Sequence, residues 1–219
     1  MFDIALNHEA KIFTRAADPL AYTEFGKFRK QLFIDKLSWK LRQRNGSEFD
    51  EFDNKHAHYL ILMYRGKITA GFRAIQCDKT YLASSKFPEL AIDRSYPDTK
   101  TSWEITRLGI DPDIAPRATG LILYALLFKF ARLQAANRLV AFTTLAHEKH
   151  LDKLGIRTKR YGPPACIGTD TFGRKMVVVA GEIDLRDQCN SKHQKLLDLA
   201  ERIHFTDETQ VFRHSSISA

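Results

Sequence analysis

The sequence predicts an α/β protein with a mixed central sheet flanked by helices, in a single domain covering residues 1–219. Segments rich in β-branched and aromatic residues alternate with longer segments of helical periodicity. No repeat or Gly/Ser/Pro-rich linker divides the 219 residues, a length that suits one domain with one large core. Apolar residues make up 44% of the chain and charged residues 27%, which excludes a disordered or fibrous protein.

The first expected elements are a helix and a β-hairpin. Residues 20–42 are expected to form the helix, because apolar residues recur there at spacings of three to five. These apolar residues are Phe25, Phe28, Phe33, Leu37 and Leu41. The hairpin is expected from two β-prone segments, 57–64 and 67–76, joined by a tight turn at Arg65–Gly66.

Further along the chain, strands and helices are expected to alternate. Residues 84–101 are expected to be irregular because they contain Pro88 and Pro97. The elements that follow are a strand at 102–110, a buried helix at 118–136, a strand at 138–145, a short helix at 148–154 ending at Gly155, a strand at 175–183 and a helix at 187–204. Residues 205–219 are expected to form a flexible tail.

This order of elements places helices against a mixed sheet. The helix at 118–136 follows a strand and a loop, so its first backbone N–H groups are free to bind an anion. Acyltransferases of the Gcn5-related N-acetyltransferase type use such an arrangement to hold a pantetheine pyrophosphate. The predicted architecture resembles their fold.

Basic residues outnumber acidic ones, and they cluster. The chain has 34 Lys and Arg against 26 Asp and Glu, a net charge of +8. The clusters lie at 27–44 and 149–160. Such clusters attract nucleic acid, a phosphate-bearing cofactor or an acidic protein, unless they form no more than a solvated helix face.

Several features favour the cytoplasm. Cys77, Cys166 and Cys189 lie far apart, which excludes a disulfide framework and a cysteine-based zinc site and suits a reducing compartment. The longest apolar run, 121–128, is far shorter than the ~20 residues that span a bilayer. The first residues lack the apolar core of a signal peptide. We therefore expect a cytoplasmic protein without a membrane span.

Common catalytic and metal-binding motifs are absent. The chain has no dinucleotide-binding or Walker glycine loop and no G-x-S-x-G, and residues 147–150 lack the spacing of H-E-x-x-H. His56 and His58 would share one face of a strand, but two histidines without a third ligand favour a surface or packing role. No metal site is predicted.

One ordered constellation extends across residues 24–110. Its members are Arg29, Phe33, Trp39, Asp50, Asp53, Arg73, Phe87-Pro88, Glu104 and Arg107. In order and spacing it closely resembles the acyl-homoserine-lactone synthases, the autoinducer synthases of bacterial quorum sensing. The resemblance continues more weakly through Thr143-Thr144 and the RYGPP segment near Tyr161. Gly71 departs from the pattern, since the family usually has its glycine three residues before the arginine, so packing under this strand is expected to differ.

The resemblance implies an acyltransferase with two substrates, S-adenosylmethionine and an acyl thioester of acyl carrier protein or coenzyme A. The α-amine of S-adenosylmethionine attacks the thioester, and lactonisation then releases methylthioadenosine, without a metal or redox cofactor. An ammonium is not a nucleophile, so a base must take its proton. The resemblance assigns this role to Glu104. The residues alone favour an ion pair between Glu104 and Arg107.

The resemblance also implies roles for the remaining residues. Together with Glu104 and Arg107, Asp50 and Asp53 are expected to be catalytic. The two aspartates can face the cationic substrate and can also bind Arg29 and Arg73, and these two roles are compatible. Arg73 and Arg107 either bind the methionyl carboxylate or hold the acidic residues. The expected substrate-binding residues are Arg29, Phe33, Trp39, Arg73, Phe87, Thr143 and Thr144.

Four of these residues also have ordinary structural interpretations. Phe33 and Trp39 offer ring faces to the sulfonium or the adenine, unless they pack in the core. Thr143 and Thr144 lie on the strand that should line the acyl pocket, where a hydroxyl can donate to a carbonyl at the third carbon of the chain. Strand propensity explains adjacent threonines equally well.

The basic residues suggest where the acyl donor docks. Arg117, at the start of the long helix, is a candidate for the pantetheine phosphate. The candidates for an acidic carrier protein are Lys149, Lys153, Arg157 and Arg160. Two other functions stay open: a related N-acyltransferase acting on a different amine, and a basic nucleic-acid-binding protein. The acidic stretch at 48–53 argues against nucleic acid, and no nucleic-acid-binding module is recognisable.

Overall fold

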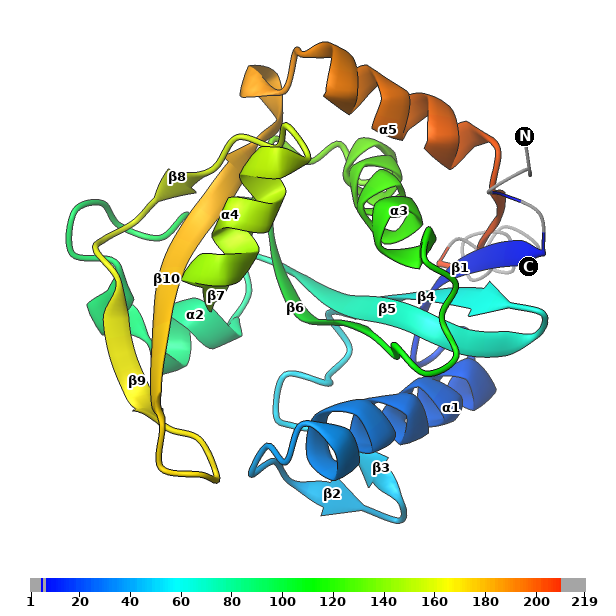
Figure 1. Cartoon of the computed structure of the whole chain (residues 1–219), viewed down its shortest axis with the longest axis horizontal. Coiled ribbons are helices and arrows are strands. Elements are labelled where there is room, and N and C mark those ends of the chain that lie inside the picture. Colours follow the sequence, from blue (N-terminus) through cyan, green and yellow to red (C-terminus); the bar gives the residue numbers. More distant parts are fainter. Residues whose placement is uncertain (1–4, 6, 210–219) are drawn as a thin grey trace, which may run out of the picture.

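A nine-stranded sheet organises the computed structural model, which describes residues 5 and 7–209 (Figure 1). The strand order is β11-β1-β4-β5-β6-β7-β10-β8, and β9 pairs with β10. These strands are β1 (His8–Thr14), β4 (Ala57–Tyr64), β5 (Lys67–Gln76), β6 (Ser102–Ile110), β7 (Arg138–Thr144), β8 (Lys159–Arg160), β9 (Ala165–Thr169), β10 (Lys175–Asp184) and β11 (His204–Asp207). A separate pair is formed by β2 (Gln43–Arg44) and β3 (Ser47–Glu48).

Helices cover both faces of the large sheet. They are α1 (Pro19–Arg29), which continues into a π-helix (Lys30–Lys36), α2 (Leu82–Lys86), α3 (Thr119–Leu133), α4 (Leu145–Lys153) and α5 (Ser191–Glu201), with 3₁₀ turns at Pro88–Leu90 and Leu185–Asp187. In Figure 1, α3 and α5 lie above the sheet and α1 lies below it. None of the helices in this described part combines the length and apolar composition needed to cross a membrane.

The sheet divides its apolar residues between two cores because successive side chains of a strand point to opposite faces. On β5, Phe72 and Ala74 join the core under α3, whereas Ile75 joins the core under α1. Arg73, between them, therefore faces the α1 side. Four aromatic rings near that side, those of Tyr22, Phe25, Phe28 and Tyr59, contact one another at centroid distances of 5.4–6.1 Å.

The sheet forks between β6 and β7. These parallel strands pair only from Ser102 to Glu104, opposite Arg138 to Val140. Beyond that point, among the residues that the structure describes, β6 pairs with β5 alone and β7 with β10 alone. Glu104 is thus the last paired residue before the strands diverge. Backbone groups beyond it face the fork, where no described strand pairs with them on that side.

A bulge follows on β6. Gly71 pairs with Gly109 and Arg73 with Thr106, so β6 has one residue more than β5 between these pairs. Arg107 lies in the bulge with a φ of 53°, in the left-handed region that a non-glycine residue rarely adopts. The extra residue changes which side chains of β6 face α1, and it allows Arg107 to reach the same side as Thr106.

The predicted α/β class, the hairpin, and the strands at 102–110, 138–145 and 175–183 are confirmed, with ends shifted by one residue at most. The helices predicted at 118–136, 148–154 and 187–204 are confirmed with shifted ends, and Gly155 has the expected left-handed φ of 78° after α4.

The predicted helix at 20–42 is wrong in its second half. Regular α-helix ends at Arg29, the π-helix ends at Lys36, and Ser38 has a positive φ of 56° that no helix continues through. Leu37 is half exposed although its spacing matched the apolar pattern. Part of the stretch expected to be irregular, 84–101, forms the end of α2 and a 3₁₀ turn.

The flexible tail predicted at 205–219 is corrected at its start. Residues 204–207 form β11, which pairs in parallel with β1, itself a strand that periodicity did not predict. This pairing gives both short segments backbone partners that neither has locally. Residues 210–219 lie outside the described residues.

The departure at Gly71 has a packing reason, and it yields a stability prediction. A Cβ at position 71 would lie 2.6 Å from the Leu60 carbonyl oxygen and 2.6 Å from the Phe25 ring. Gly71→Ala should therefore lower the free energy of unfolding by about 1–3 kcal/mol, measured by urea denaturation. The matched control is Gly120→Ala, where the built Cβ is 3.5 Å from Ile110, an ordinary contact. Equal stability of the two variants would contradict the close packing.

Candidate active site

An ionic network joins the N-terminal helix, the loop after β3 and the sheet. It contains three carboxylates, those of Glu48, Asp50 and Asp53, and three guanidinium groups, those of Arg29, Arg73 and Arg107. The charges balance. Arg29 comes from the last turn of α1, Arg73 from β5 and Arg107 from the bulge of β6.

Arg29 and Arg73 direct their donors into the network. The Nε of Arg29 donates to Glu48 at 2.6 Å, and its two terminal nitrogens donate to Asp53 at 2.7 and 3.0 Å. Arg73 donates to both oxygens of Asp50, and its Nη1 also lies 3.0 Å from Asp53. Both arginine side chains are fully buried.

This burial corrects two predictions. Arg29 and Arg73 were expected to bind substrate, but both are enclosed and engaged with carboxylates in the structure. Their donors cannot meet a substrate without leaving buried charges unpaired. Of the two roles considered for the acidic pair, binding to Arg29 and Arg73 is the one that the structure shows.

Arg107 and Asp50 form the exposed edge of the network. Arg107 donates to Glu48 at 3.0 Å and to Asp50 at 2.9 Å. Their side chains are 10% and 13% exposed, whereas those of Glu48 and Asp53 are 1% exposed. A ligand on this side therefore meets Arg107 and Asp50 first.

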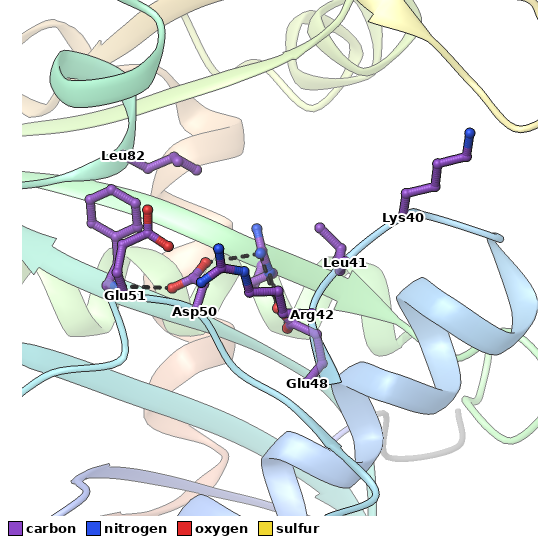
Figure 2. A pocket seen from close by; sticks show the side chains of 9 residues that line it. Lys40, Leu41, Arg42, Glu48, Asp50, Glu51 and Leu82 are labelled. Carbon is purple, nitrogen blue, oxygen red and sulfur yellow. Dashed lines mark hydrogen bonds and ion pairs between the residues drawn. The ribbon is translucent and has the colours of Figure 1, made fainter. Parts of the chain in front are cut away.

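A hollow of about 290 Å³ opens over this edge. It is lined by Lys40, Leu41, Arg42, Glu48, Asp50, Glu51, Phe52, Leu82 and Arg107. Figure 2 shows Leu82, from α2, on one side of it and Lys40 and Leu41, from the loop after the π-helix, on the other, with Asp50 between them.

The arginines keep the buried carboxylates ionised. Burial by itself raises the pKa of Asp53, but Arg29 and Arg73 outweigh it and hold the pKa well below its usual range. The pKa of Glu48 is likewise lowered, because Arg29 and Arg107 outweigh the effect of burial. Both acids therefore favour the charged form more strongly than exposed carboxylates do.

Glu104 has a different environment. Its oxygens accept hydrogen bonds from the backbone N–H groups of Leu82, at 2.9 Å, and Ala83, at 2.6 Å. The side chain is almost fully buried, and burial raises its pKa to about 7 against the opposing effect of these two donors. The ion pair between Glu104 and Arg107 that the residues alone favoured is wrong, since Arg107 pairs with Glu48 and Asp50 instead.

The aromatic candidates separate into core and exposed residues. Phe33 is buried and lies where a Cβ on Gly109 would touch it, so its packing interpretation is confirmed. Trp39 stacks on Phe33 at a centroid distance of 5.0 Å but remains 44% exposed. Phe87 contacts Phe142 at 4.9 Å, on the same face of the sheet.

The two threonines also differ. Thr144 is the N-cap of α4 and its hydroxyl accepts from the His147 N–H at 3.3 Å. Thr143 pairs with Val179 of β10 and is half-buried. Because neighbours on a strand point to opposite faces, the two side chains do not share one pocket wall.

The docking candidates lie on and around α4 and before α3. Arg117, Lys149, Lys153 and Arg157 are exposed, and none of them forms an ion pair within the described residues. Arg160 donates to Glu148 at 2.7 Å, so its charge is already compensated. The basic surface is therefore smaller than the sequence cluster suggested.

Sequence reasoning missed Glu48. It bridges Arg29 and Arg107, yet only the later acids of the 48–53 stretch were selected. The available signal was the spacing of Glu48 and Asp50, which lie two residues apart and so point the same way in extended chain.

In the described part of the chain, no group of three or more His, Cys, Asp or Glu side chains could hold a metal ion.

The network predicts a pH-dependent stability. Arg29→Met removes the cation that Glu48 and Asp53 share. The free energy of unfolding at pH 7 should therefore fall by about 3–5 kcal/mol. The lowered pKa of Asp53 stabilises the fold above the unfolded-state pKa of about 3.9, and this contribution is lost as the pH falls through the folded-state value.

The deficit of Arg29→Met should therefore shrink below about pH 4, as measured by urea denaturation across pH. The control is Arg132→Met, which removes only an exposed pair with Glu201 and should cost less than about 1 kcal/mol at any pH. A deficit of Arg29→Met that matches the control would contradict the buried network.

Known proteins resemble this chain in sequence and in fold. The acyl-homoserine-lactone synthase of Aeromonas hydrophila is 31% identical over 145 residues, which cover 64% of this chain and 70% of that protein. The acyl-homoserine-lactone synthase of Pseudomonas aeruginosa is 30% identical over 153 residues, or 68% of this chain and 75% of the relative.

The fold is shared with a solved acyl-homoserine lactone synthase, BjaI, which is coenzyme A-dependent and was solved with S-adenosylmethionine and isopentyl-CoA. The TM-score is 0.78 at 21% sequence identity, and the match covers 90% of this chain and 93% of that one. The predicted resemblance to the Gcn5-related N-acetyltransferase fold is thereby confirmed. The sequence profile of the autoinducer synthases matches residues 18–188, and this chain belongs to the autoinducer synthase family.

Proposed function

We propose that this protein makes N-acyl-homoserine lactones from S-adenosylmethionine and an acyl thioester. The observation that carries this proposal is the position of Glu104. It is a buried carboxylate with a pKa near 7, at the fork of the sheet and on the same face as the network of Arg73 and Asp50. Family membership supports the same reaction.

In this reaction Glu104 takes a proton from the α-ammonium of S-adenosylmethionine, directly or through one water. An α-amine has a pKa of about 8, so a carboxylate with a pKa near 7 is well matched to it. The amine nitrogen then attacks the thioester carbonyl carbon, the carbon–sulfur bond breaks, and the leaving thiolate takes up the second proton that the nitrogen loses.

Lactonisation completes the reaction. A carboxylate oxygen of the acylated methionyl group attacks the γ-carbon of the same group, the bond from this carbon to the sulfonium sulfur breaks, and its electrons leave with methylthioadenosine. Both steps balance without an oxidant or a metal, so we propose that no resident cofactor takes part.

The exposed edge of the network provides the binding groups for S-adenosylmethionine. Asp50 offers a carboxylate to the cationic substrate, and Arg107 offers a guanidinium to its carboxylate. The exposed face of Trp39 is available for the sulfonium or the adenine. Arg29, Arg73 and Asp53 form the buried part of the ionic network that positions Asp50 and Arg107.

The acyl thioester fits the fork between β6 and β7. Backbone N–H groups left unpaired there can bind the thioester oxyanion. Phe87 and Phe142 offer apolar surface to the acyl chain, beside the half-buried Thr143. Arg117 and the buried hydroxyl of Thr119, which has no partner among the described residues, lie at the start of α3, where the pantetheine phosphate would bind.

The donor is an acylated carrier protein or an acyl-coenzyme A, both strongly anionic. Lys149, Lys153 and Arg157 supply an uncompensated positive surface for either. We propose that the protein works in the cytoplasm, since its three separated cysteines suit a reducing compartment. A nucleic-acid partner has no support in this site.

Replacing the proposed base tests the function directly. Glu104→Gln should keep the fold but lower turnover at least about a hundredfold, because Gln keeps the shape but cannot take the proton. The melting temperature should fall modestly, since the amide nitrogen of Gln leaves one of the two backbone N–H donors without an acceptor. The assay measures methylthioadenosine release together with the acylated product. Near-wild-type turnover would remove Glu104 from this role. Acylation without methylthioadenosine release would instead favour an N-acyltransferase that acts on another amine.

Reversing the charge of the basic surface tests the docking of the donor. The double variant Lys153→Glu/Arg157→Glu should raise the KM for an acylated carrier protein and make it less sensitive to salt, because electrostatic steering is lost. The control is Lys67→Glu/Lys100→Glu, which changes the net charge equally at exposed positions away from α4. The same salt dependence in both double variants would place docking elsewhere.

A further inference from the structure

The carboxylate of Glu104 is oriented by backbone and not by side chains. Its Oε2 accepts from the Leu82 N–H and its Oε1 from the Ala83 N–H. Two bonds to two different oxygens fix both the position and the plane of the group. Within the described residues, these are the hydrogen bonds that reach its oxygens. The other site acids, by contrast, are held by guanidinium groups.

We propose that the N–H groups of Leu82 and Ala83 position Glu104 for proton transfer, and that the segment 81–83 thereby sets the pH range in which the enzyme turns over. The inference rests on the proposed role of Glu104 as the base. It assigns a role to main-chain atoms that no catalytic motif in the sequence marks.

The surroundings of Glu104 explain why these donors matter. Arg73, on β5, favours its charged form and Asp50 opposes it, but the guanidinium of Arg73 is already engaged with Asp50, Asp53 and Thr106. The other titratable neighbours are Cys77, Tyr81 and Tyr96.

Burial raises the pKa of the thiol and of both phenols, so these groups are neutral when the enzyme works. Among the described residues, Arg73 is thus the cation that favours the ionised base, and its guanidinium makes its own bonds elsewhere, so the two N–H groups are the direct contacts that offset the burial of Glu104.

A proline at position 82 removes one of these donors with little other change. Leu82 is the first residue of α2, the helix position where proline is best tolerated. Tyr81, which precedes it, has φ −131° and ψ 165°, the extended backbone that a following proline requires. The matched control is Leu82→Ala, which removes the same side chain from the hollow but keeps the N–H.

The readout is the acidic limb of the pH profile of kcat/KM, measured by methylthioadenosine release. A donated hydrogen bond favours the ionised carboxylate, so its loss raises the pKa of Glu104 and moves the limb to higher pH. Leu82→Pro should move the midpoint up by about one pH unit relative to Leu82→Ala, with turnover recovering at alkaline pH. Equal midpoints in the two variants would overturn the proposal.

A second measurement needs no proline variant. The backbone amide protons of Leu82 and Ala83 in the wild-type protein should change chemical shift with pH, with the same midpoint as the kinetic limb. Both shifts should be independent of pH in Glu104→Gln. Amide signals that stay constant across the limb in the wild type would refute the proposal, even if Leu82→Pro fails to fold.

The two measurements also separate this inference from the proposed function. If Glu104→Gln turns over at the wild-type rate, the proposed base is wrong and the inference falls with it. If Glu104→Gln is inactive but the limb does not move in Leu82→Pro, then only the positioning role is wrong.

Discussion

Three largely buried carboxylates, those of Glu48, Asp50 and Asp53, are compatible with folding only because three guanidinium groups surround them. Removing any one cation would leave a charge in a medium of low dielectric constant. The constraint is also architectural, because the arginines come from α1, β5 and β6. Neutralising these charges therefore fixes the N-terminal helix and the acidic loop onto the sheet, and it places Asp50 at the edge of the hollow.

The network in turn depends on two irregularities of the sheet. A regular β6 would alternate Arg107 away from Thr106, but the bulge and its positive φ let both side chains reach the α1 face. The early end of the pairing between β6 and β7 opens the sheet beside Glu104. Backbone groups that a continuous sheet would have paired are thus left without a partner strand on this side among the described residues.

The same face of the sheet gives its acids two opposite environments. Asp53 lies between arginines that lower its pKa, whereas Glu104 receives only backbone donors and has its pKa raised to about 7 by burial. One acid is thus charged at neutral pH and structural, and the other can exchange a proton near neutral pH. Such a separation of pKa values between neighbouring acids is typical of sites that carry out acid–base catalysis.

The sequence by itself determined the α/β class, the hairpin and the strand carrying Glu104, since local periodicity and turn residues suffice for these. The sequence also indicated Arg29, Asp53 and Arg73 as site residues, because they belong to the ordered constellation that resembles the autoinducer synthases. Only the tertiary structure decided which acid pairs with which arginine, that Glu104 binds backbone and not Arg107, and that Trp39 is exposed while Phe33 is buried. These outcomes depend on strand register, on the bulge and on contacts between segments far apart in the chain, which no local pattern encodes.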